Sequence, residues 1–205
     1  MEIKKFQVGY MPTNCYVLSE GGLAVIVDPG GGYGKIGAYL EESGNRPVAV
    51  VLTHGHFDHI ADVFKWHKDG AVVYIHEADA PCLYSSGPSL AAMVGLTIPP
   101  VRDYKTFSDG ETLKFGAIEL NVIHTPGHTV GSCCFSLPGD VILTGDTVMC
   151  GTFGRTDFPG GSSEQIKYSI IEKLFSIEGD KLLYPGHGES TTLKNERLNN
   201  PVLYL

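Results

Sequence analysis

The stretch from Val48 to Ile60 (VAVVLTHGHFDHI) constrains the fold of this chain more than any other segment. It begins with an apolar run, Val48–Leu52, which predicts a strand buried on both faces, because a half-buried strand would alternate apolar and polar residues. Three histidines and one aspartate follow within six positions: His54, His56, Asp58 and His59. Side chains two residues apart in an extended chain point the same way, so His54 and His56 are expected to bind one metal ion together.

The residues after His54 predict a bend that leads into a helix. Gly55 allows the backbone to bend, Asp58 is expected to be the helix N-cap, and His59 is expected to begin the helix and point to the opposite side. The helix is expected to continue over Ile60–Lys68 and to be capped by Gly70. Two pairs of ligand-type side chains would then face two neighbouring points, as a two-metal site requires. The alternative, a polar loop with scattered histidines, is disfavoured because the cluster stands at a strand end, where sheet proteins build their sites.

Three further ligand-type residues each follow an apolar, strand-like run: His128 in TPGHT, Asp146 in LTGDT and His187 in YPGHG. Together with the cluster, they resemble the signature of the metallo-β-lactamase superfamily, which joins H-x-H-x-D-H to a distant histidine, a distant aspartate and a last histidine. The resemblance implies an α/β fold, the four-layer αββα sandwich of the metallo-β-lactamase fold. We expect a single domain of this fold over residues 1–205, since no linker or break in composition divides the chain.

The remaining pattern fits two strand-rich halves, each followed by helices. Strands are expected at Ile3–Val8, Cys15–Leu18, Leu23–Val27 and Ala71–Ile75, with hairpins over Gly116-Ala117 and Pro138–Asp140. Helices are expected at Tyr33–Ser43, Glu77–Leu83, Ser163–Phe175 and Thr192–Leu198. Residues 84–104 contain breaking Gly and Pro residues and an apolar run, Leu90–Leu96. This segment predicts either a lid or acyl-pocket wall near the site, or a loop packed on the body.

The resemblance also implies how two metal ions are held. Metal 1 would bind His54, His56 and His128, metal 2 would bind Asp58, His59 and His187, and Asp146 would bridge the two. Zinc is the expected ion because it accepts imidazole and carboxylate ligands and leaves a position for water, and iron or manganese could replace it. A metal-bound hydroxide would then attack the substrate, which makes Asp58 and Asp146 the expected catalytic carboxylates.

Composition restricts the class of partner. The formal net charge is −8, which disfavours nucleic acid because its binding needs a basic face. The N-terminus has no apolar signal-peptide core, and no apolar run is long enough to cross a membrane, so we expect a cytoplasmic location and no membrane partner. Five cysteines without a C-x-x-C pair fit reduced thiols. Cys150, close after Asp146, is expected to be a small buried hydrophobic residue.

Several features bear on the substrate. True lactamases of the superfamily commonly carry a cysteine ligand where Asp146 stands, and they are exported, so lactam hydrolysis is disfavoured. The segments 145–161, which contain GRTDF, and 186–192 resemble the glyoxalase II-like (hydroxyacylglutathione hydrolase-like) branch. That branch cleaves thioesters such as S-lactoylglutathione, a small-molecule substrate whose thiolate, with a pKa near 8.5, leaves without a strong general acid. We expect no C-terminal glutathione-binding helical domain, since the sequence stops soon after Pro201.

Two other functions stay open at this point. Persulfide dioxygenases are related oxidoreductases that share the GRTDF string and bind a single iron through counterparts of His54, His128 and Asp146. A non-catalytic metal-binding module is a third possibility, disfavoured because all seven ligand-type residues are present. Two metals per chain would favour hydrolysis, whereas one iron with oxygen consumption would favour dioxygenation.

Two residues outside the ligand set stand out. Glutathione carries two carboxylates, which a guanidinium binds best, and of the four arginines only Arg155 lies in a Gly-rich loop close after a proposed ligand. Arg155 is therefore expected at the pocket rim as a substrate-binding residue, or alternatively paired with Asp157 to fix that loop. Asp28, in the DPG that closes a predicted strand, either orients a ligand histidine or is a simple turn residue.

Overall fold

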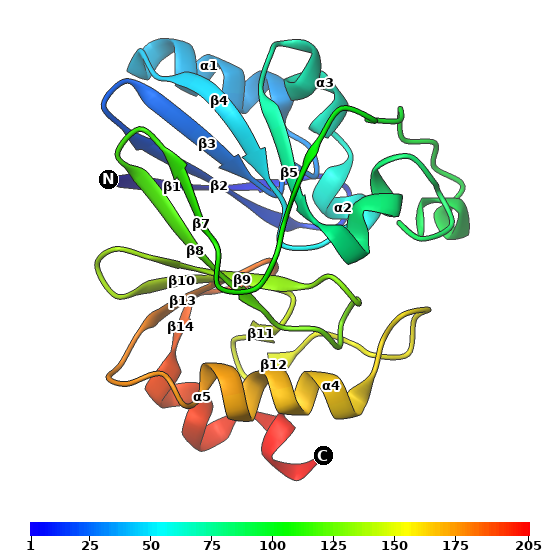
Figure 1. Cartoon of the computed structure of the whole chain (residues 1–205), viewed down its shortest axis with the longest axis vertical. Helices are drawn as coiled ribbons and strands as arrows, with labels where there is room; N and C mark the ends of the chain where they lie inside the picture. Colours follow the sequence, from blue (N-terminus) through cyan, green and yellow to red (C-terminus); the bar gives the residue numbers. More distant parts are fainter.

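The computed structural model describes residues 1–205, which form two facing β-sheets with helices on both outer faces (Figure 1). The first sheet has the order β1-β2-β3-β4-β5-β6. Its strands are β1 (Glu2–Val8), β2 (Thr13–Glu20), β3 (Leu23–Val27), β4 (Arg46–Val51), β5 (Val72–His76) and β6 (Lys105–Phe107). Strands β3 to β6 run parallel, because helices connect them across the outer face. The predicted αββα sandwich is confirmed.

The second sheet has the order β14-β13-β10-β9-β8-β7. Its strands are β7 (Thr112–Phe115), β8 (Ile118–His124), β9 (Cys133–Leu137), β10 (Val141–Gly145), β13 (Leu182–Pro185) and β14 (Thr191–Thr192). A small separate hairpin pairs β11 (Val148–Met149) with β12 (Thr152–Phe153). Both predicted hairpins are present, β7–β8 and β9–β10, since each turn lies between antiparallel partners.

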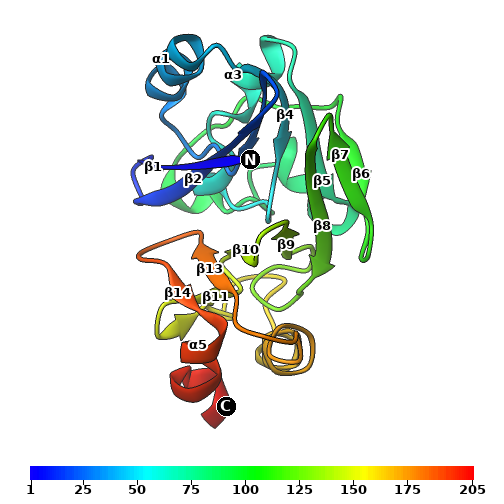
Figure 2. The same cartoon turned by 90° about the vertical axis from the view of Figure 1, so that its left-hand side faces the viewer.

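The helices lie on the two outer faces of the sandwich, as the turned view shows (Figure 2). The first face carries α1 (Tyr33–Ser43), α2 (Phe57–Ile60) and α3 (Val63–Lys68), and the other carries α4 (Ser163–Tyr168), its π-helical continuation Ser169–Leu174, and α5 (Leu193–Asn199). Short 3₁₀ segments are Glu77–Leu83, Ala91–Val94 and Pro201–Tyr204. The predicted α1 ends at Gly44, whose φ of 68° is the left-handed C-cap conformation that glycine favours.

Three separate hydrophobic clusters fill the spaces between the four layers. In β4, Val50 belongs to the cluster under α1 and α3, whereas Ala49 and Val51 belong to the cluster between the sheets. A third cluster, around Ile166 and Ile170, joins the second sheet to α4 and α5. Because both faces of β4 are buried, its sequence is an apolar run rather than an alternation.

Three predictions about the helix after the histidine cluster are wrong: its N-cap, its continuation over Ile60–Lys68 and its cap at Gly70. The N-cap is His56, with extended φ and ψ of −67° and 148°, and Asp58 is the second residue of α2. The helix then breaks: the Asp62 N–H donates to the carbonyl of Pro29, and the Asp62 carboxylate accepts from the Tyr33 N–H. A separate helix, α3, resumes at Val63, and its C-cap is Asp69 rather than Gly70.

Backbone hydrogen bonds join the two sheets at one edge of the sandwich. The Cys133 N–H donates to the Thr53 carbonyl at 2.8 Å, and the Asn14 N–H donates to the Gly186 carbonyl at 2.7 Å. Thr53 precedes the histidine cluster and Gly186 precedes His187, so these bonds hold the loop after β4 against β9 of the second sheet and the loop after β13 against β2 of the first sheet. This edge carries the candidate site.

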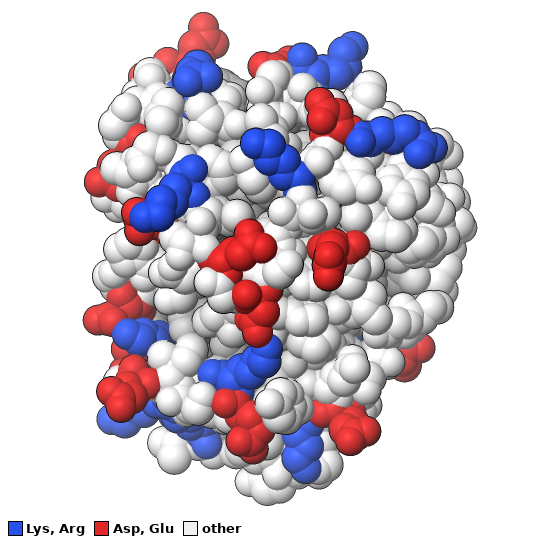
Figure 3. Space-filling model, viewed as in Figure 1, with Lys and Arg blue, Asp and Glu red and all other residues white.

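The surface and the helices add two observations. On the face shown in Figure 3, Lys and Arg side chains are scattered among Asp and Glu rather than gathered in one area. None of the helices combines the length and the apolar composition that crossing a membrane requires.

Candidate metal centre

Three histidines from two loops form a first group of ligand-type atoms. His54 and His56 follow β4, and His128 lies between β8 and β9. One nitrogen from each lies within 4.8 Å of the others. His56 Nδ1 is 2.9 Å from His128 Nε2, and His54 Nε2 is buried without a hydrogen-bond partner. All three side chains are buried, so their inward nitrogens are withdrawn from water.

A second group combines one carboxylate with two histidines. Asp58 and His59 come from α2, and His187 follows β13. His187 Nε2 lies 3.2 Å from Asp58 Oδ2 and 3.3 Å from His59 Nε2. The structure therefore brings Asp58, His59 and His187 together, although they are separated by up to 129 positions in the sequence.

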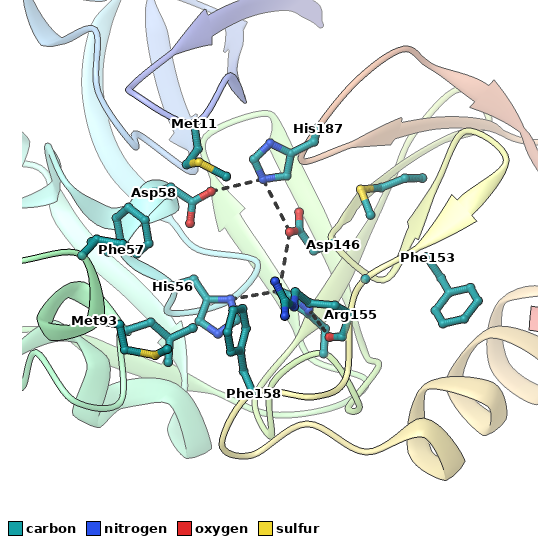
Figure 4. A pocket seen from close by; sticks show the side chains of 15 residues that line it. Met11, His56, Phe57, Asp58, Met93, Asp146, Phe153, Arg155, Phe158 and His187 are labelled. Atoms are coloured by element: carbon teal, nitrogen blue, oxygen red, sulfur yellow. Dashed lines mark hydrogen bonds and ion pairs between the residues drawn. The ribbon is translucent and has the colours of Figure 1, made fainter.

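Asp146, directly after β10, lies between the two groups (Figure 4). Its Oδ2 is 3.5 Å from His128 Nε2 in the first group and 3.5 Å from His187 Nε2 in the second. Its Oδ1 is 3.5 Å from His59 Nε2 and has no hydrogen-bond partner although it is buried. All seven residues predicted from the sequence thus meet at one place.

Hydrogen bonds on the outer nitrogens fix the histidine rings. The Nδ1 atoms of His128 and His187 donate to the carbonyls of Arg155 and Pro12, at 2.8 and 3.1 Å. His59 Nδ1 donates to Asp28 Oδ2 at 2.9 Å, and His54 Nδ1 donates to Thr53 Oγ1 at 3.1 Å. Each of these four rings is therefore held with Nε2 directed inward, the orientation that a metal ligand requires.

Asp28 connects the two groups from behind. Besides His59 Nδ1, it accepts hydrogen bonds from the Thr53 N–H at 2.8 Å and the Thr53 hydroxyl at 2.6 Å. The same hydroxyl accepts from His54, so one buried carboxylate orients a histidine of each group. Of the two readings of Asp28 offered by the sequence, the structure supports the one in which it orients a histidine.

Asp79 performs a similar task for the loops of the first group. It is 2% exposed. Its Oδ2 accepts from the Gly55 N–H at 2.9 Å and from the Thr129 hydroxyl at 2.7 Å, and its Oδ1 accepts from the Gly131 N–H at 2.8 Å. Gly55 lies between His54 and His56, and Thr129 follows His128. Asp79 therefore ties together the two loops that supply the first group.

Burial and neighbouring charges set the protonation of these groups. Burial, reinforced by the other histidines, lowers the pKa of His54 well below its usual value and lowers the pKa of His56 to about 3. Burial would also lower the pKa of His59, but the carboxylates of Asp146, Asp58 and Asp28 raise it to about 10. His54 and His56 thus present neutral imidazoles, and the carboxylates around His59 concentrate negative charge that attracts a cation.

The donor set fits metal ions. Neutral imidazoles whose Nε2 lone pairs converge repel one another unless a cation lies between them, and a buried carboxylate oxygen without a partner is costly. His54 Nε2 and Asp146 Oδ1 are such atoms. Imidazole and carboxylate donors suit zinc, iron and manganese alike, so the side chains alone do not select the metal.

A pocket of about 500 Å³ opens over the two groups (Figure 4). Its polar lining consists of His56, Asp58, His128, Asp146 and His187 with Arg155. Its apolar lining consists of Met11, Phe57, Leu90, Met93, Val94, Met149, Phe153 and Phe158. Residues 84–104 therefore contribute a wall to the pocket, one of the alternatives that the sequence left open.

Arg155 meets both expectations from the sequence, a position at the pocket and a pair with Asp157. It lines the pocket, and its Nε donates to Asp157 Oδ1 at 2.6 Å and its Nη2 to Asp157 Oδ2 at 2.5 Å. Its guanidinium carbon stands 3.9 Å from the centre of the Phe158 ring. The expectation for Cys150 is wrong, because its side chain is exposed on the turn of the β11–β12 hairpin, outside the hydrophobic clusters.

Sequence reasoning missed Asp79, Thr53 and most of the apolar lining. In the sequence, Asp79 is one of two acids in a short helical segment, Glu77–Leu83, and its position in the chain does not indicate a contact with the ligand loops. Phe57 did carry a signal, since it is a large apolar residue between His56 and Asp58.

Comparisons with known proteins agree with this geometry. The model of the metallo-beta-lactamase superfamily matches residues 8–187. An uncharacterized protein of Mycobacterium leprae is 42% identical, with 99% of each chain covered. The probable metallo-hydrolase YqgX of Bacillus subtilis is 34% identical over 99% of this chain and 98% of its own. The hydroxyacylglutathione hydrolase GloC of Haemophilus influenzae is 32% identical over 99% of this chain and 98% of its own.

Solved structures of similar proteins include three with different descriptions. The B3 metallo-beta-lactamase BLEG-1 superposes with a TM-score of 0.91 and 31% identity, over 98% of this chain and 99% of its own. TTHA1623 in a di-iron-bound form superposes with a TM-score of 0.87 and 32% identity, over 98% of this chain and 100% of its own. ETHE1 from Myxococcus xanthus superposes with a TM-score of 0.82 and 25% identity, over 98% of this chain and 84% of its own.

Proposed function

Because the chain belongs to the metallo-β-lactamase superfamily, we propose that it is a metal-dependent hydrolase that cleaves a thioester of the hydroxyacylglutathione type. The observation that carries this proposal is the position of Asp146, whose Oδ2 lies 3.5 Å from a histidine of each ligand group. A shared carboxylate suits two metal ions acting on one substrate. The similarity to GloC supports the choice of substrate class.

The proposed ligand sets follow the two groups. His54, His56 and His128 would hold one metal ion, Asp58, His59 and His187 would hold the other, and Asp146 would contribute to both. Zinc is the ion we favour, and iron is a specific alternative because TTHA1623 was solved in a di-iron form. Two divalent ions bound there would supply a Lewis acid for the substrate carbonyl and lower the pKa of water from 15.7 towards 7.

The side chains of this protein supply charge, orientation and access. Asp58 and Asp146 are the proposed catalytic carboxylates, and each is mostly buried, so their negative charges act with little screening by water. Thr13 Oγ1 lies 3.3 Å from Asp58 Oδ2 and helps to hold that carboxylate. Outside the proposed ligands, the pocket lining contains no acid to protonate a leaving group. A thioester suits this pocket because a thiolate, with a pKa near 8.5, leaves unprotonated.

Arg155 is the proposed contact for the thiol half of the substrate. A guanidinium has five N–H donors, and Asp157 occupies only Nε and one hydrogen of Nη2. The remaining donors are free to bind a carboxylate at the rim of the pocket.

A second candidate is a mononuclear-iron, persulfide dioxygenase-like oxidoreductase. It would use His54 and His128 with Asp146, and the 3.5 Å separation of Asp146 from His128 is compatible with such a set. The similarity to ETHE1, at 25% identity, supports this second candidate.

Metal analysis combined with substrate assays tests the proposal. We expect close to two divalent ions per chain and hydrolysis of S-lactoylglutathione without oxygen consumption. One iron per chain, with oxygen consumed on glutathione persulfide, would replace the hydrolase by the dioxygenase. Opening of a β-lactam ring without thioester cleavage would instead align the protein with BLEG-1.

A further inference from the structure

We propose that the pocket selects thioesters whose acyl group is bulky and apolar, such as an aryl-substituted acyl group, over small hydroxyacyl groups like lactoyl. The inference rests on the proposed thioester hydrolysis and names the acyl half of its substrate. It is carried by four side chains on one side of the pocket, Phe57, Leu90, Met93 and Val94, which we call the acyl wall.

The acyl wall lies beside the proposed metal ligands. Phe57 stands in the chain between His56 and Asp58, and in Figure 4 Phe57 and Met93 lie on the same side of the pocket, away from Arg155. Phe158, whose ring centre is 6.1 Å from that of His56, closes the pocket between the two sides. A carbonyl at the ligand groups can therefore extend its acyl group along the wall while its thiol half points towards Arg155.

Charge on the lining separates the two halves of the substrate. Arg155 is the only arginine or lysine among the lining residues and is paired with Asp157, and in Figure 4 it lies away from Phe57 and Met93. The acyl wall itself offers no charged group, so it recognises an apolar surface and not a carboxylate. A lactoyl group has one methyl and one hydroxyl, so it would cover little of the apolar surface that the four side chains of the acyl wall provide.

Two side chains of the acyl wall are exposed at the pocket mouth. Met93 is 66% exposed and Val94 is 53% exposed. Apolar side chains grouped around a pocket mouth indicate a surface that a ligand covers, and methionine adapts to irregular apolar groups because its side chain is flexible. An aryl group in this position would remove apolar surface of both partners from water.

The backbone holds the wall against the ligand helix. The Phe57 N–H donates to the Ser89 carbonyl at 2.8 Å, which joins α2 to the turn before the wall. Leu90 is nearly buried and has a φ of 63°, a left-handed conformation that a leucine adopts only when its surroundings impose it. The wall is thus a fixed part of the site and not a loose loop.

A matched pair of thioesters tests the inference on the metal-loaded protein. S-mandeloylglutathione and S-lactoylglutathione have the same thiol half and differ by a phenyl in place of a methyl group. We expect kcat/KM to be at least tenfold higher for the mandeloyl thioester, since apolar pockets discriminate by tenfold or more per added group. Met93→Ser should lower the mandeloyl-to-lactoyl ratio at least fivefold. Leu198→Ser, which changes a residue 67% exposed on α5, should leave the ratio unchanged.

Binding of non-hydrolysable analogues gives a second readout. S-phenacylglutathione and S-acetonylglutathione are thioether ketones that differ in the same way, and calorimetry should show at least tenfold tighter binding of the phenacyl compound. Equal kcat/KM and equal affinity within each pair would overturn the inference while leaving thioester hydrolysis intact. If neither thioester is cleaved but the phenacyl analogue still binds tenfold more tightly, the proposed function fails and the apolar preference of the wall stands.

Discussion

Replacing Asp79 by asparagine should loosen the first group of proposed ligands and spare the second. The carboxylate accepts two hydrogen bonds from the His54–His56 loop and the His128 loop at Oδ2, and one at Oδ1. An asparagine amide presents one oxygen and one NH₂ group. The Thr129 hydroxyl can reverse and accept from that NH₂, but a backbone N–H cannot. Whichever way the amide is turned, either Gly55 or Gly131 keeps an unpaired, buried N–H.

The magnitude follows from that count. One buried donor left unpaired costs about 1–3 kcal/mol, and the charge-assisted character of the other bonds is also lost. We expect the free energy of unfolding to fall by roughly 3 kcal/mol, which lowers the Tm of a chain of this length by about 6–12 °C. Loss of a group that supports metal ligands weakens metal binding by about 10–100-fold, and here the loss should fall on the ion held by His54, His56 and His128.

The assay is dialysis against a graded series of chelator concentrations, followed by elemental analysis and thermal denaturation. The matched control is Glu196→Gln, another fully buried carboxylate. Glu196 accepts from the Thr191 hydroxyl at 2.6 Å, from Asn200 Nδ2 at 2.7 Å and from the Gly151 N–H at 3.2 Å, and none of these partners is next to a proposed ligand in the chain. It should lose stability but keep both ions. If Asp79→Asn also keeps both ions at every chelator concentration that wild type withstands, Asp79 supports only the fold, and the reasoning fails.

Four further changes test other parts of the site. Asp146→Ala should release both ions, because Asp146 contacts both groups, and full metal content measured by elemental analysis would contradict the bridging role. Asp58→Ala should lose one ion and at least a hundredfold in kcat, since metal-assisted attack contributes several kcal/mol, and activity within a few-fold of wild type would favour the mononuclear alternative. Arg155→Ala should raise KM for glutathione thioesters about tenfold, or about 1.4 kcal/mol, with little change in KM for small uncharged thioesters. An equal increase in KM for both substrate classes would show that Arg155 is a structural residue. Gly186→Ala should disrupt metal binding, because a Cβ there would lie 2.2 Å from Asp146 Oδ1. The control is Gly34→Ala on α1, where a Cβ would meet no other atom, and this variant should retain both ions and be slightly stabilised.

The ligand residues could be predicted from the sequence because the segments that carry them follow strand ends. The apolar runs before His54, Asp146 and His187 are the buried strands β4, β10 and β13, and a strand end fixes where the next side chain points. The local details were less predictable. Asp58 has the character of an N-cap, but the Phe57 N–H is paired with Ser89, far along the chain, and α2 starts at Phe57. A tertiary hydrogen bond of this kind leaves no mark in local sequence.

The groups that hold and surround the ligands are harder to predict for a related reason. Asp79 acts on loops 24 and 50 positions away in the sequence. The apolar lining comes from the β1–β2 turn, α2, the Leu90–Val94 segment, the β11–β12 hairpin and the loop after it. No periodicity links these segments, because what brings them together is the closure of the sandwich around the ligands. The metal chemistry therefore depends on residues at strand ends, whereas the choice of acyl group depends on loops whose lengths and apolar content can change without moving a strand. Chains that share all seven ligand-type residues can for that reason act on different substrates, and the 84–104 segment and the loop around Phe158 are where such differences should be sought.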